Sequence, residues 1–145
     1  MAQQVGQLDS NGRWPADVAV WHVAMPPAGT CVNGAVLDGD ERERALRYRR
    51  PADRTRYAVT RAVLRELLGQ RLGTEPASLR FATSGHGRPE LFGIPGISFN
   101  VSHSGDHGLI AISQARAVGI DVEYIDPSLD WRKRLGWAVS SRARE

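Results

Sequence analysis

The chain has 145 residues, including 19 Lys or Arg and 16 Asp or Glu, which gives a formal net charge of +3. This length suits one domain with a single core, and the composition excludes a disordered or fibrous protein. Residues 1–13 are polar and lack an apolar signal core, and no apolar run is long enough to span a bilayer. We therefore expect a soluble cytoplasmic protein with no membrane partner.

Cysteine and lysine are each present only once, as Cys31 and Lys133. A single cysteine excludes an internal disulfide and argues against a cysteine-based zinc site. Arginine is the better bidentate partner of phosphate and carboxylate, so its excess over lysine is consistent with anionic ligands. A genome rich in G and C gives the same bias, and we favour that explanation.

Residues 1–16 are expected to form a flexible N-terminus. The run from Asp17 to Ala24 is β-branched and mostly apolar, and Met25-Pro-Pro27 follows it, so it predicts a fairly buried strand. His22 within this strand is interpreted as a packed strand residue and not as a ligand.

Two helices are predicted after this strand. Asp38 or Asp40 can cap a short charged helix that extends to about Arg50, where Pro51 stops it. The second helix covers about residues 53–72 and ends before a glycine.

At about 100° per residue, the second helix places Arg54, Arg61 and Arg65 on one polar stripe, opposite a broad apolar face. Arg56 falls on the apolar face in the first turn, where a charge is costly unless it is paired. Backbone N–H groups at the start of a helix also favour an anion. Two interpretations stay open: a phosphate or carboxylate ligand neutralises Arg56, or its side chain reaches solvent or an internal Asp.

The run from Leu79 to Ala82 predicts a strand that leads into a loop, Thr83 to Leu91. The glycines and the proline of this loop indicate an unusual backbone path. Arg88 precedes Pro89 in the loop. It either helps to hold an anion or is a surface arginine in a turn.

Three closely spaced strands are predicted next, Ile97 to His103, Leu109 to Ser113 and Val118 to Glu123. Their connections have hairpin lengths, which favours an antiparallel meander. Side chains on a strand alternate between its faces, so Ser102 and His103 point in opposite directions.

Asp121 and Glu123 share one face of the third predicted strand, and an apolar row shares the other. Two carboxylates at this spacing can reach one hard cation, although such a pair is more often a solvated strand face. In an alternating meander, the pair reaches the same end of the sheet as His103. We therefore expect His103, Ser102 and the two carboxylates to line one site.

Three stretches resemble, in order and spacing, the motifs of the Sfp-type 4′-phosphopantetheinyl transferases: Gly87-Arg-Pro-Glu-Leu91, Phe99-Asn-Val-Ser-His103 and Val118-Gly-Ile-Asp-Val-Glu123. Arg54-Thr-Arg-Tyr57 also resembles a helix segment of that family. The resemblance covers about residues 17–130. It implies an α+β lobe in which a mostly antiparallel sheet with a strand meander packs against one long helix. In that family, such a lobe is the N-terminal half of a two-lobed protein.

Members of that family use magnesium to transfer the 4′-phosphopantetheine arm of coenzyme A to a serine of an acyl or peptidyl carrier protein. By position, the resemblance implies two sets of site residues. The implied contacts of the coenzyme A phosphates are Arg56, Arg88, Ser102 and His103. The implied magnesium ligands are Asp121 and Glu123, which together with His103 are also the implied catalytic residues.

The family pattern does not continue to the end of this sequence. Its second half carries a further acidic residue and a lysine in a Trp-x-x-Lys-Glu-Ala type segment, which Trp131-Arg-Lys-Arg134 does not match. We expect residues 17–125 to form the lobe and residues 126–145 to be a tail that runs into a missing second lobe. The chain alone is then expected to be inactive unless a second chain completes the lobe interface.

Two other interpretations stay open. One is a non-catalytic protein that keeps the coenzyme A phosphate contacts but performs no transfer. The other is a nucleic-acid module, which rests on nine arginines between Arg42 and Arg65. Acidic residues are interleaved with these arginines and no aromatic stacking platform accompanies them, so we expect no nucleic-acid partner.

Overall fold

The structure is a computed structural model that describes residues 4–32, 34–85, 87–125 and 127–128. Its helices are α1 (Gly39–Arg47), α2 (Pro51–Leu72) and the short 3₁₀ helix η1 (Pro76–Ser78). Its strands are β1 (Val5–Leu8), β2 (Val18–Ala24), β3 (Phe81–Thr83), β4 (Pro89–Leu91), β5 (Ser98–Ser104) and β6 (His107–Ser113). None of the helices in these residues is both long and apolar enough to cross a membrane.

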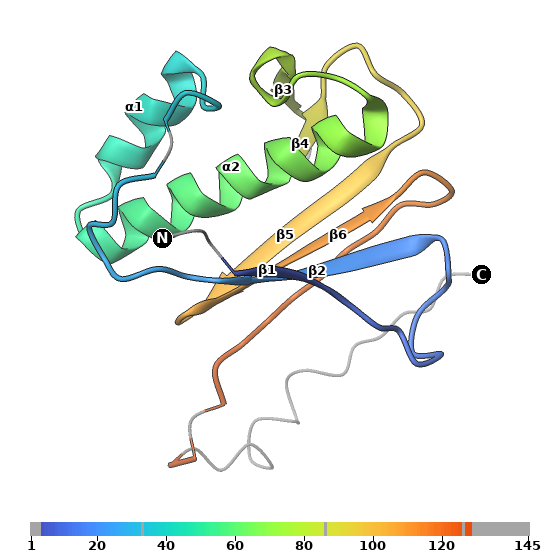
Figure 1. Ribbon diagram of the computed structural model, residues 1–145, viewed down its shortest axis with the longest axis horizontal. Coiled ribbons are helices and arrows are strands. Elements are labelled where there is room, and N and C mark those ends of the chain that lie inside the picture. Colours follow the sequence, from blue (N-terminus) through green and yellow to red (C-terminus); the bar gives the residue numbers. More distant parts are fainter. Residues whose placement is uncertain (1–3, 33, 86, 126, 129–145) are drawn as a thin grey trace.

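The molecule has two layers, because α2 lies across one face of the main sheet and α1 lies beside α2 (Figure 1). The main sheet has the strand order β1-β2-β6-β5, and every neighbouring pair is antiparallel. Strands β3 and β4 form a separate two-stranded sheet. The predicted fold class, an α+β lobe with a mostly antiparallel sheet against one long helix, is confirmed.

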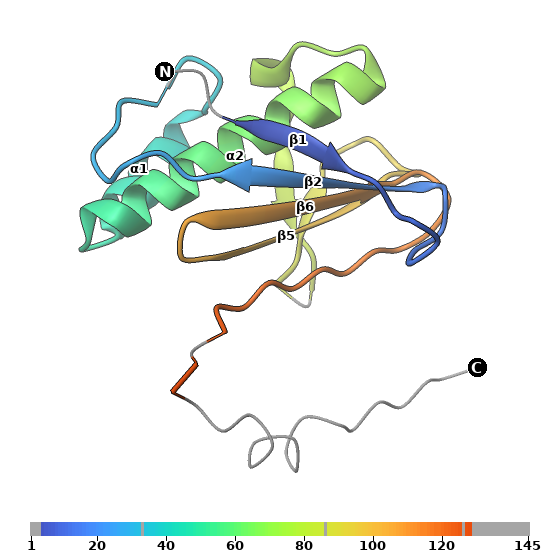
Figure 2. The same cartoon turned by 60° about the horizontal axis from the view of Figure 1, so that its bottom comes forward.

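The third strand of the predicted meander is not formed. Residues 118–123 have no strand structure, and β6 pairs on its other edge with β2, from Val18↔Ser113 to Ala24↔His107. The chain after β6 instead passes beneath the sheet, on the side opposite the helices (Figure 2). The prediction was wrong because β2, which is far away in the sequence, pairs with the edge of β6 where the third strand was expected. The lengths of the connections do not reveal such a pairing.

Two short strands were not predicted. β1 lies within the segment that was expected to be a flexible N-terminus, and it pairs with β2 from Val5↔Val23 to Leu8↔Val20. β4 lies within the predicted loop and pairs with β3. Both strands have only three or four residues, which is too few for a clear alternation of apolar and polar side chains.

Local sequence explains where the two long helices begin and end. Asp38 caps α1 and forms a capping box with Glu41: its carboxylate accepts from Glu41 N at 2.8 Å, and Glu41 Oε1 accepts from Asp38 N at 3.0 Å. The prediction that α1 extends to about Arg50 and is stopped by Pro51 was wrong: α1 ends at Arg47, and Pro51 begins α2, where no N–H is needed. Gly73 ends α2 as predicted, in the left-handed conformation with φ 65°.

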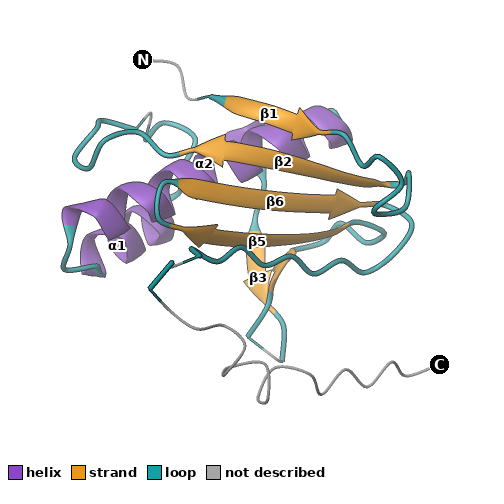
Figure 3. Ribbon diagram, turned by 90° about the horizontal axis from the view of Figure 1, so that it is seen from below, coloured by secondary structure: helices purple, strands orange, loops and turns teal. Residues whose placement is uncertain are grey.

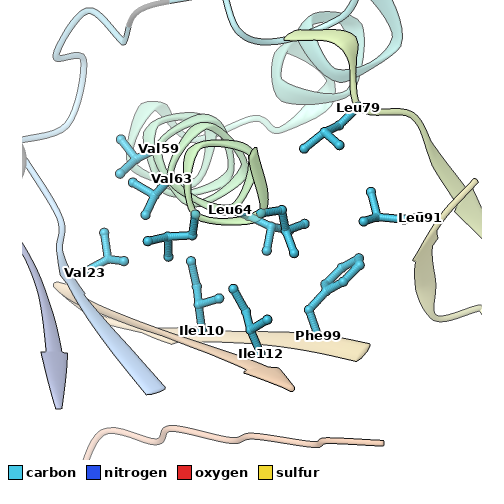
Figure 4. Close-up of a cluster of buried hydrophobic side chains, with 11 residues drawn as sticks. Val23, Val59, Val63, Leu64, Leu79, Leu91, Phe99, Ile110 and Ile112 are labelled. Carbon is cyan, nitrogen blue, oxygen red and sulfur yellow. The ribbon is translucent and has the colours of Figure 1, made fainter. Parts of the chain in front are cut away.

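The core lies between α2 and the main sheet (Figure 4). Its apolar side chains come from α2, from the facing side of β2, β5 and β6, and from the chain around β3 and β4. The labelled core residues are Val23, Val59, Val63, Leu64, Leu79, Leu91, Phe99, Ile110 and Ile112. The prediction that the apolar face of α2 packs on the sheet is therefore confirmed for Val59 and Val63.

A buried ion network joins α1 to the predicted polar stripe of α2. Arg65 is fully buried, with 0% of its surface exposed. Its guanidinium donates to Glu41 Oε1 at 2.8 Å, to Asp38 Oδ2 at 3.2 Å, and to the carbonyls of Pro76 and Leu79. Arg54 of the stripe is exposed, whereas Arg65 is enclosed because α1 packs over it and supplies the carboxylates that neutralise its charge.

Candidate functional site at the hairpin end of β5

Strand β5 presents different chemistry on its two faces. Phe99 packs in the core beneath α2, so Val101 and His103 share that face by alternation. The opposite face carries small polar side chains at every second position: Ser98, Asn100, Ser102 and Ser104. Figure 3 shows the sheet from this second side, with β5 as its outer strand.

Side chains of β5 hold residues 118–124 alongside the strand (Figure 3). The backbone N–H groups of Val118, Ile120, Val122 and Tyr124 donate to side-chain oxygens of Ser98, Asn100, Ser102 and Ser104, at 3.1, 2.7, 3.0 and 2.9 Å in that order. We call these four hydrogen bonds the side-chain ladder. Donor and acceptor are 20 residues apart in the sequence in each of the four bonds, so the segment runs parallel to β5. It is not a strand of the sheet, because these bonds go to side chains and not to the backbone of β5.

The predicted alternation along this segment is confirmed even though the strand is not. Val118 is buried against Val20 and Ala111 of the sheet, whereas Asp121 and Glu123 are exposed. The parallel direction brings the two carboxylates to the hairpin end of β5, which is the end at which sequence reasoning placed them.

Ser102 connects the motif Phe99 to His103 with the motif Val118 to Glu123. Its hydroxyl donates to Asp121 Oδ1 at 3.0 Å and accepts from Val122 N at 3.0 Å. The hydroxyl therefore uses its donor on the carboxylate and a lone pair on the backbone. This pair of bonds restrains the direction in which the Asp121 carboxylate points.

Arg56 lies where the first turn of α2 meets the turn between β5 and β6. Its guanidinium donates to the carbonyl of Gly105 at 2.8 Å and to Asp53 Oδ1 at 2.9 Å. Of the two open interpretations, the internal Asp partner is the one that the structure contains. The side chain also lines a pocket of about 270 Å³ with Met25 and Asp106, so an anion in that pocket would share Arg56 with Asp53.

Arg88 joins three parts of the chain. Its Nη2 group donates to the carbonyl of Phe99 at 3.0 Å and to the carbonyl of Val118. It therefore connects the loop before β4 to β5 and to the start of the side-chain ladder. Ser102 is three residues further along β5, about 10 Å away at the rise of a strand. The structure thus does not bring the Arg88 guanidinium to the carboxylate pair.

His103 lies on the face of β5 that is turned toward α2. It lines a pocket of about 220 Å³ together with Tyr57, Arg61 and Val101. The guanidinium of Arg61 lies 5.7 Å from the centre of the Tyr57 ring, and burial raises the pKa of the Tyr57 hydroxyl. This pocket combines positive charge with an aromatic wall, which suits an anionic or ring-bearing ligand.

The structure thus divides the predicted site. Ser102 and Asp121 are in contact on one face of β5, while His103 lies on the other face and lines the pocket with Tyr57 and Arg61. The expectation that all of these side chains line one surface needs correction, because adjacent strand residues point in opposite directions. β5 is the outer strand, so a ligand at its edge can approach both faces.

Sequence reasoning assigned no role to Ser98, Asn100 or Ser104, which hold the carboxylate segment in place. The available signal was a small polar residue at every second position of an otherwise apolar strand. Such a pattern is usual for a solvated face, so the partner segment could not be inferred from it.

The donor set fits a hard cation. Asp121 and Glu123 offer only oxygen ligands, they are exposed, and they lie two residues apart on an extended segment. Mg²⁺ is commonly bound by one or two carboxylates, with phosphate oxygens and water filling the other positions. Within the described residues no three His, Cys, Asp or Glu side chains converge on one point. Asp121 and Glu123 would thus fill only part of the coordination of a Mg²⁺ ion.

Asp17 anchors the link between β6 and the side-chain ladder. Its carboxylate accepts two hydrogen bonds from Arg116, at 2.7 and 2.9 Å, and one from Ser113 at 2.8 Å. These bonds, the one from Arg116 foremost, lower the pKa of Asp17 below its usual value of 3.8. The ionised carboxylate therefore stabilises the folded chain above that value, and this stabilisation is lost as the pH falls through the lowered pKa.

We expect Arg116→Gln to raise the pKa of Asp17 toward 3.8, because the main charged donor is removed. The measurement is a titration of the Asp17 carboxyl carbon by NMR in the folded protein. Asp9→Asn, which changes an exposed carboxyl outside this cluster, should leave the Asp17 midpoint unchanged. A wild-type midpoint at or above 3.8 would contradict the hydrogen-bonded arrangement.

The sequence of the chain is similar to known proteins of one family. A family model described as 4′-phosphopantetheinyl transferase, N-terminal, matches residues 26–115. The 4′-phosphopantetheinyl transferase HetI of Nostoc sp. is 36% identical over 119 residues, which are 79% of this chain and 50% of HetI. The 4′-phosphopantetheinyl transferase Sfp of Bacillus subtilis is 29% identical over 100 residues, covering 68% of this chain and 44% of Sfp.

A putative 4′-phosphopantetheinyl transferase of Synechocystis sp., slr0495, is 38% identical over 101 residues, which are 68% of this chain and 41% of that protein. The chain therefore belongs to the 4′-phosphopantetheinyl transferase family, and it matches that family's N-terminal region. It spans about half, or less, of the length of these relatives.

Proposed function

We propose that this chain forms the lobe of a 4′-phosphopantetheinyl transferase that binds coenzyme A and Mg²⁺, with the lobe formed by residues 17–125. The reaction is the transfer of the phosphopantetheine arm to a serine of an acyl or peptidyl carrier protein. The observation that carries the proposal is the hydrogen bond from Ser102 to Asp121, which joins two motifs of the family at the hairpin end of β5.

Displacement at a pyrophosphate requires its charge to be neutralised and its oxygens to be held in line with the attacking hydroxyl. In our proposal Asp121 and Glu123 hold Mg²⁺, and Ser102 fixes the direction of Asp121. When bound, Mg²⁺ supplies neutralisation of the pyrophosphate charge. Arg56 and His103 approach the phosphates from the other side of the β5 edge.

Arg88 has a different role in this proposal from the one implied by the resemblance. Two of its hydrogen bonds go to backbone carbonyls of Phe99 and Val118. We propose that Arg88 fixes the start of the side-chain ladder and contacts a phosphate with its remaining N–H groups.

We also propose that transfer needs a second lobe or a second chain, because the relatives continue well beyond the matched region. The predicted tail, residues 126–145, lies outside the described residues except for residues 127–128. It carries no part of this argument.

The test combines a binding and a transfer measurement. The chain is mixed with coenzyme A and Mg²⁺ in a calorimeter, and in a second experiment with an apo carrier protein, whose mass is then measured. We expect Mg²⁺-dependent binding of coenzyme A that weakens at least about tenfold in Arg56→Met, because a charge-assisted hydrogen bond to a phosphate is lost. Arg71→Met, at an exposed position near the end of α2, is the matched control.

The outcomes separate the proposal from its alternative. A gain of one phosphopantetheine mass on the carrier serine only after a second lobe is supplied supports the proposal. A gain with the chain alone supports the transferase function but contradicts the need for a second lobe. Binding of coenzyme A without a mass gain, even after a second lobe is supplied, favours the alternative, a coenzyme A-binding protein that performs no transfer. Absence of coenzyme A binding contradicts both.

A further inference from the structure

His22 and His107 face each other on the side of the sheet away from α2, because they alternate with the core residues Val23 and Ile110. Figure 3 views the sheet from that side. His22 Nε2 and His107 Nδ1 lie 2.8 Å apart, and the ring centres are 5.1 Å apart with the planes tilted by 37°. The two residues are diagonal neighbours on adjacent strands, because His22 is opposite Leu109 and His107 is opposite Ala24. Sequence reasoning treated His22 as a packed strand residue and did not pair it with His107.

The contact requires one of the two facing nitrogens to carry a proton and the other to present a lone pair. A metal ion can take the place of that shared proton, because neutral imidazole nitrogen is a ligand for Zn²⁺, Ni²⁺ and Cu²⁺. Carboxylate oxygens, by contrast, suit Mg²⁺ and Ca²⁺. The pair therefore differs in metal preference from the carboxylates of Asp121 and Glu123.

The distance between the nitrogens is close to that of a coordinated pair. Bonds of about 2.0–2.1 Å from metal to imidazole nitrogen, at angles between 90° and 109°, place two nitrogens about 2.9–3.3 Å apart. The observed 2.8 Å needs to widen by only a few tenths of an ångström. Both rings must also turn so that their lone pairs point at one ion and not at each other, and the broad minima of the terminal side-chain torsions permit such rotations.

The backbone under the two rings is held in place by the sheet. β2 has hydrogen-bonded neighbours on both sides, β1 and β6, and β6 lies between β2 and β5. His107 is exposed, so water has access to the remaining coordination positions. A pair of ligands on a rigid scaffold loses little freedom when it binds an ion.

We propose that His22 and His107 form a binding site for one transition-metal ion of the Zn²⁺, Ni²⁺ or Cu²⁺ class. His22 Nε2 and His107 Nδ1 bind the ion, and water completes its coordination. The site is independent of the proposed transferase function, which assigns no role to either histidine. An ion there links β2 to β6 and stabilises the folded chain by binding to it and not to the unfolded chain.

The test is calorimetric titration with Ni²⁺ of chain that carries no affinity tag. Cys31→Ser serves as the background, because the exposed thiol of Cys31 is itself a metal ligand. Excess Mg²⁺ is present throughout to occupy carboxylate sites. We expect one ion per chain, with affinity at least about tenfold lower in His22→Gln and in His107→Gln.

His103→Gln is the matched control, because His103 is also exposed and lies in the same sheet but on its other face. It should keep the affinity of the background protein. Thermal unfolding with and without Ni²⁺ gives a second readout: the background protein should gain stability, and both glutamine variants should not. Equal affinity in all three variants, or no binding by the background protein, would overturn the proposal.

Discussion

Replacing Arg65 with methionine is expected to lower the free energy of unfolding by about 3–5 kcal/mol, the usual effect of removing one partner of a buried ion pair. Arg65 has no exposed surface, and its loss leaves the carboxylate of Glu41 buried without its main partner. It also removes donors from the carbonyls of Pro76 and Leu79. Urea unfolding followed by circular dichroism at neutral pH measures the change.

Arg71→Met is the matched control for this prediction, since it makes the same change at an exposed position of α2 and should shift stability by no more than about 0.5 kcal/mol. Adding Glu41→Leu to Arg65→Met should restore part of the loss, because an apolar pair removes the uncompensated charge. A loss below about 1 kcal/mol in Arg65→Met would show that Glu41 reaches water in the variant and that the network is not closed.

Replacing Asp121 with asparagine is expected to weaken metal binding by about 100-fold in the presence of coenzyme A, because one of two carboxylate ligands is lost. Mn²⁺ serves as the probe for Mg²⁺, and the free ion is measured by electron paramagnetic resonance. Ser102→Ala keeps both carboxylates but removes the hydrogen bond that orients Asp121, so a smaller loss of about tenfold is expected.

Glu66→Gln is the control for these two variants, because it removes an exposed carboxylate of α2 far along the chain from the site. Its Mn²⁺ affinity should equal that of the unchanged protein. If Asp121→Asn also binds Mn²⁺ with unchanged affinity, the carboxylates of residues 118–124 form a solvated face and not a metal site.

Local sequence was sufficient for most of the helical and strand structure. Asp38 and Gly73 mark helix ends by bonds to groups a few residues away, so their roles depend on short-range chemistry that a sequence pattern contains. The apolar run of β2 and the alternating side chains of β5 likewise indicated these two strands. Residues 118–123 show the limit, because the same alternation arises in a segment that bonds to side chains instead of to a strand.

Sequence reasoning named the residues of the candidate site, but it predicted only part of their arrangement in space. Asp121 and Ser102 were placed at the same end of the sheet, and they are in contact. An internal Asp partner of Arg56 was one of the two open interpretations, and the structure contains it. The carbonyl partners of Arg56 and Arg88 could not be predicted, because their positions depend on the folded chain. The burial of Arg65 could not be predicted for a similar reason: it depends on α1 packing over α2, and a helical wheel considers one helix at a time.

The side-chain ladder attaches residues 118–124 to β5, and the strength of this attachment can be changed one hydrogen bond at a time. A backbone ladder is made by every residue regardless of its type, so substitutions seldom remove one bond alone. Here Asn100 and Ser104 each supply one separate acceptor, and replacing either removes one bond while the hydrogen bonds of β5 to β6 remain. Evolution or design can thus tune how firmly the carboxylate segment is held, one residue at a time, without altering the sheet beneath it.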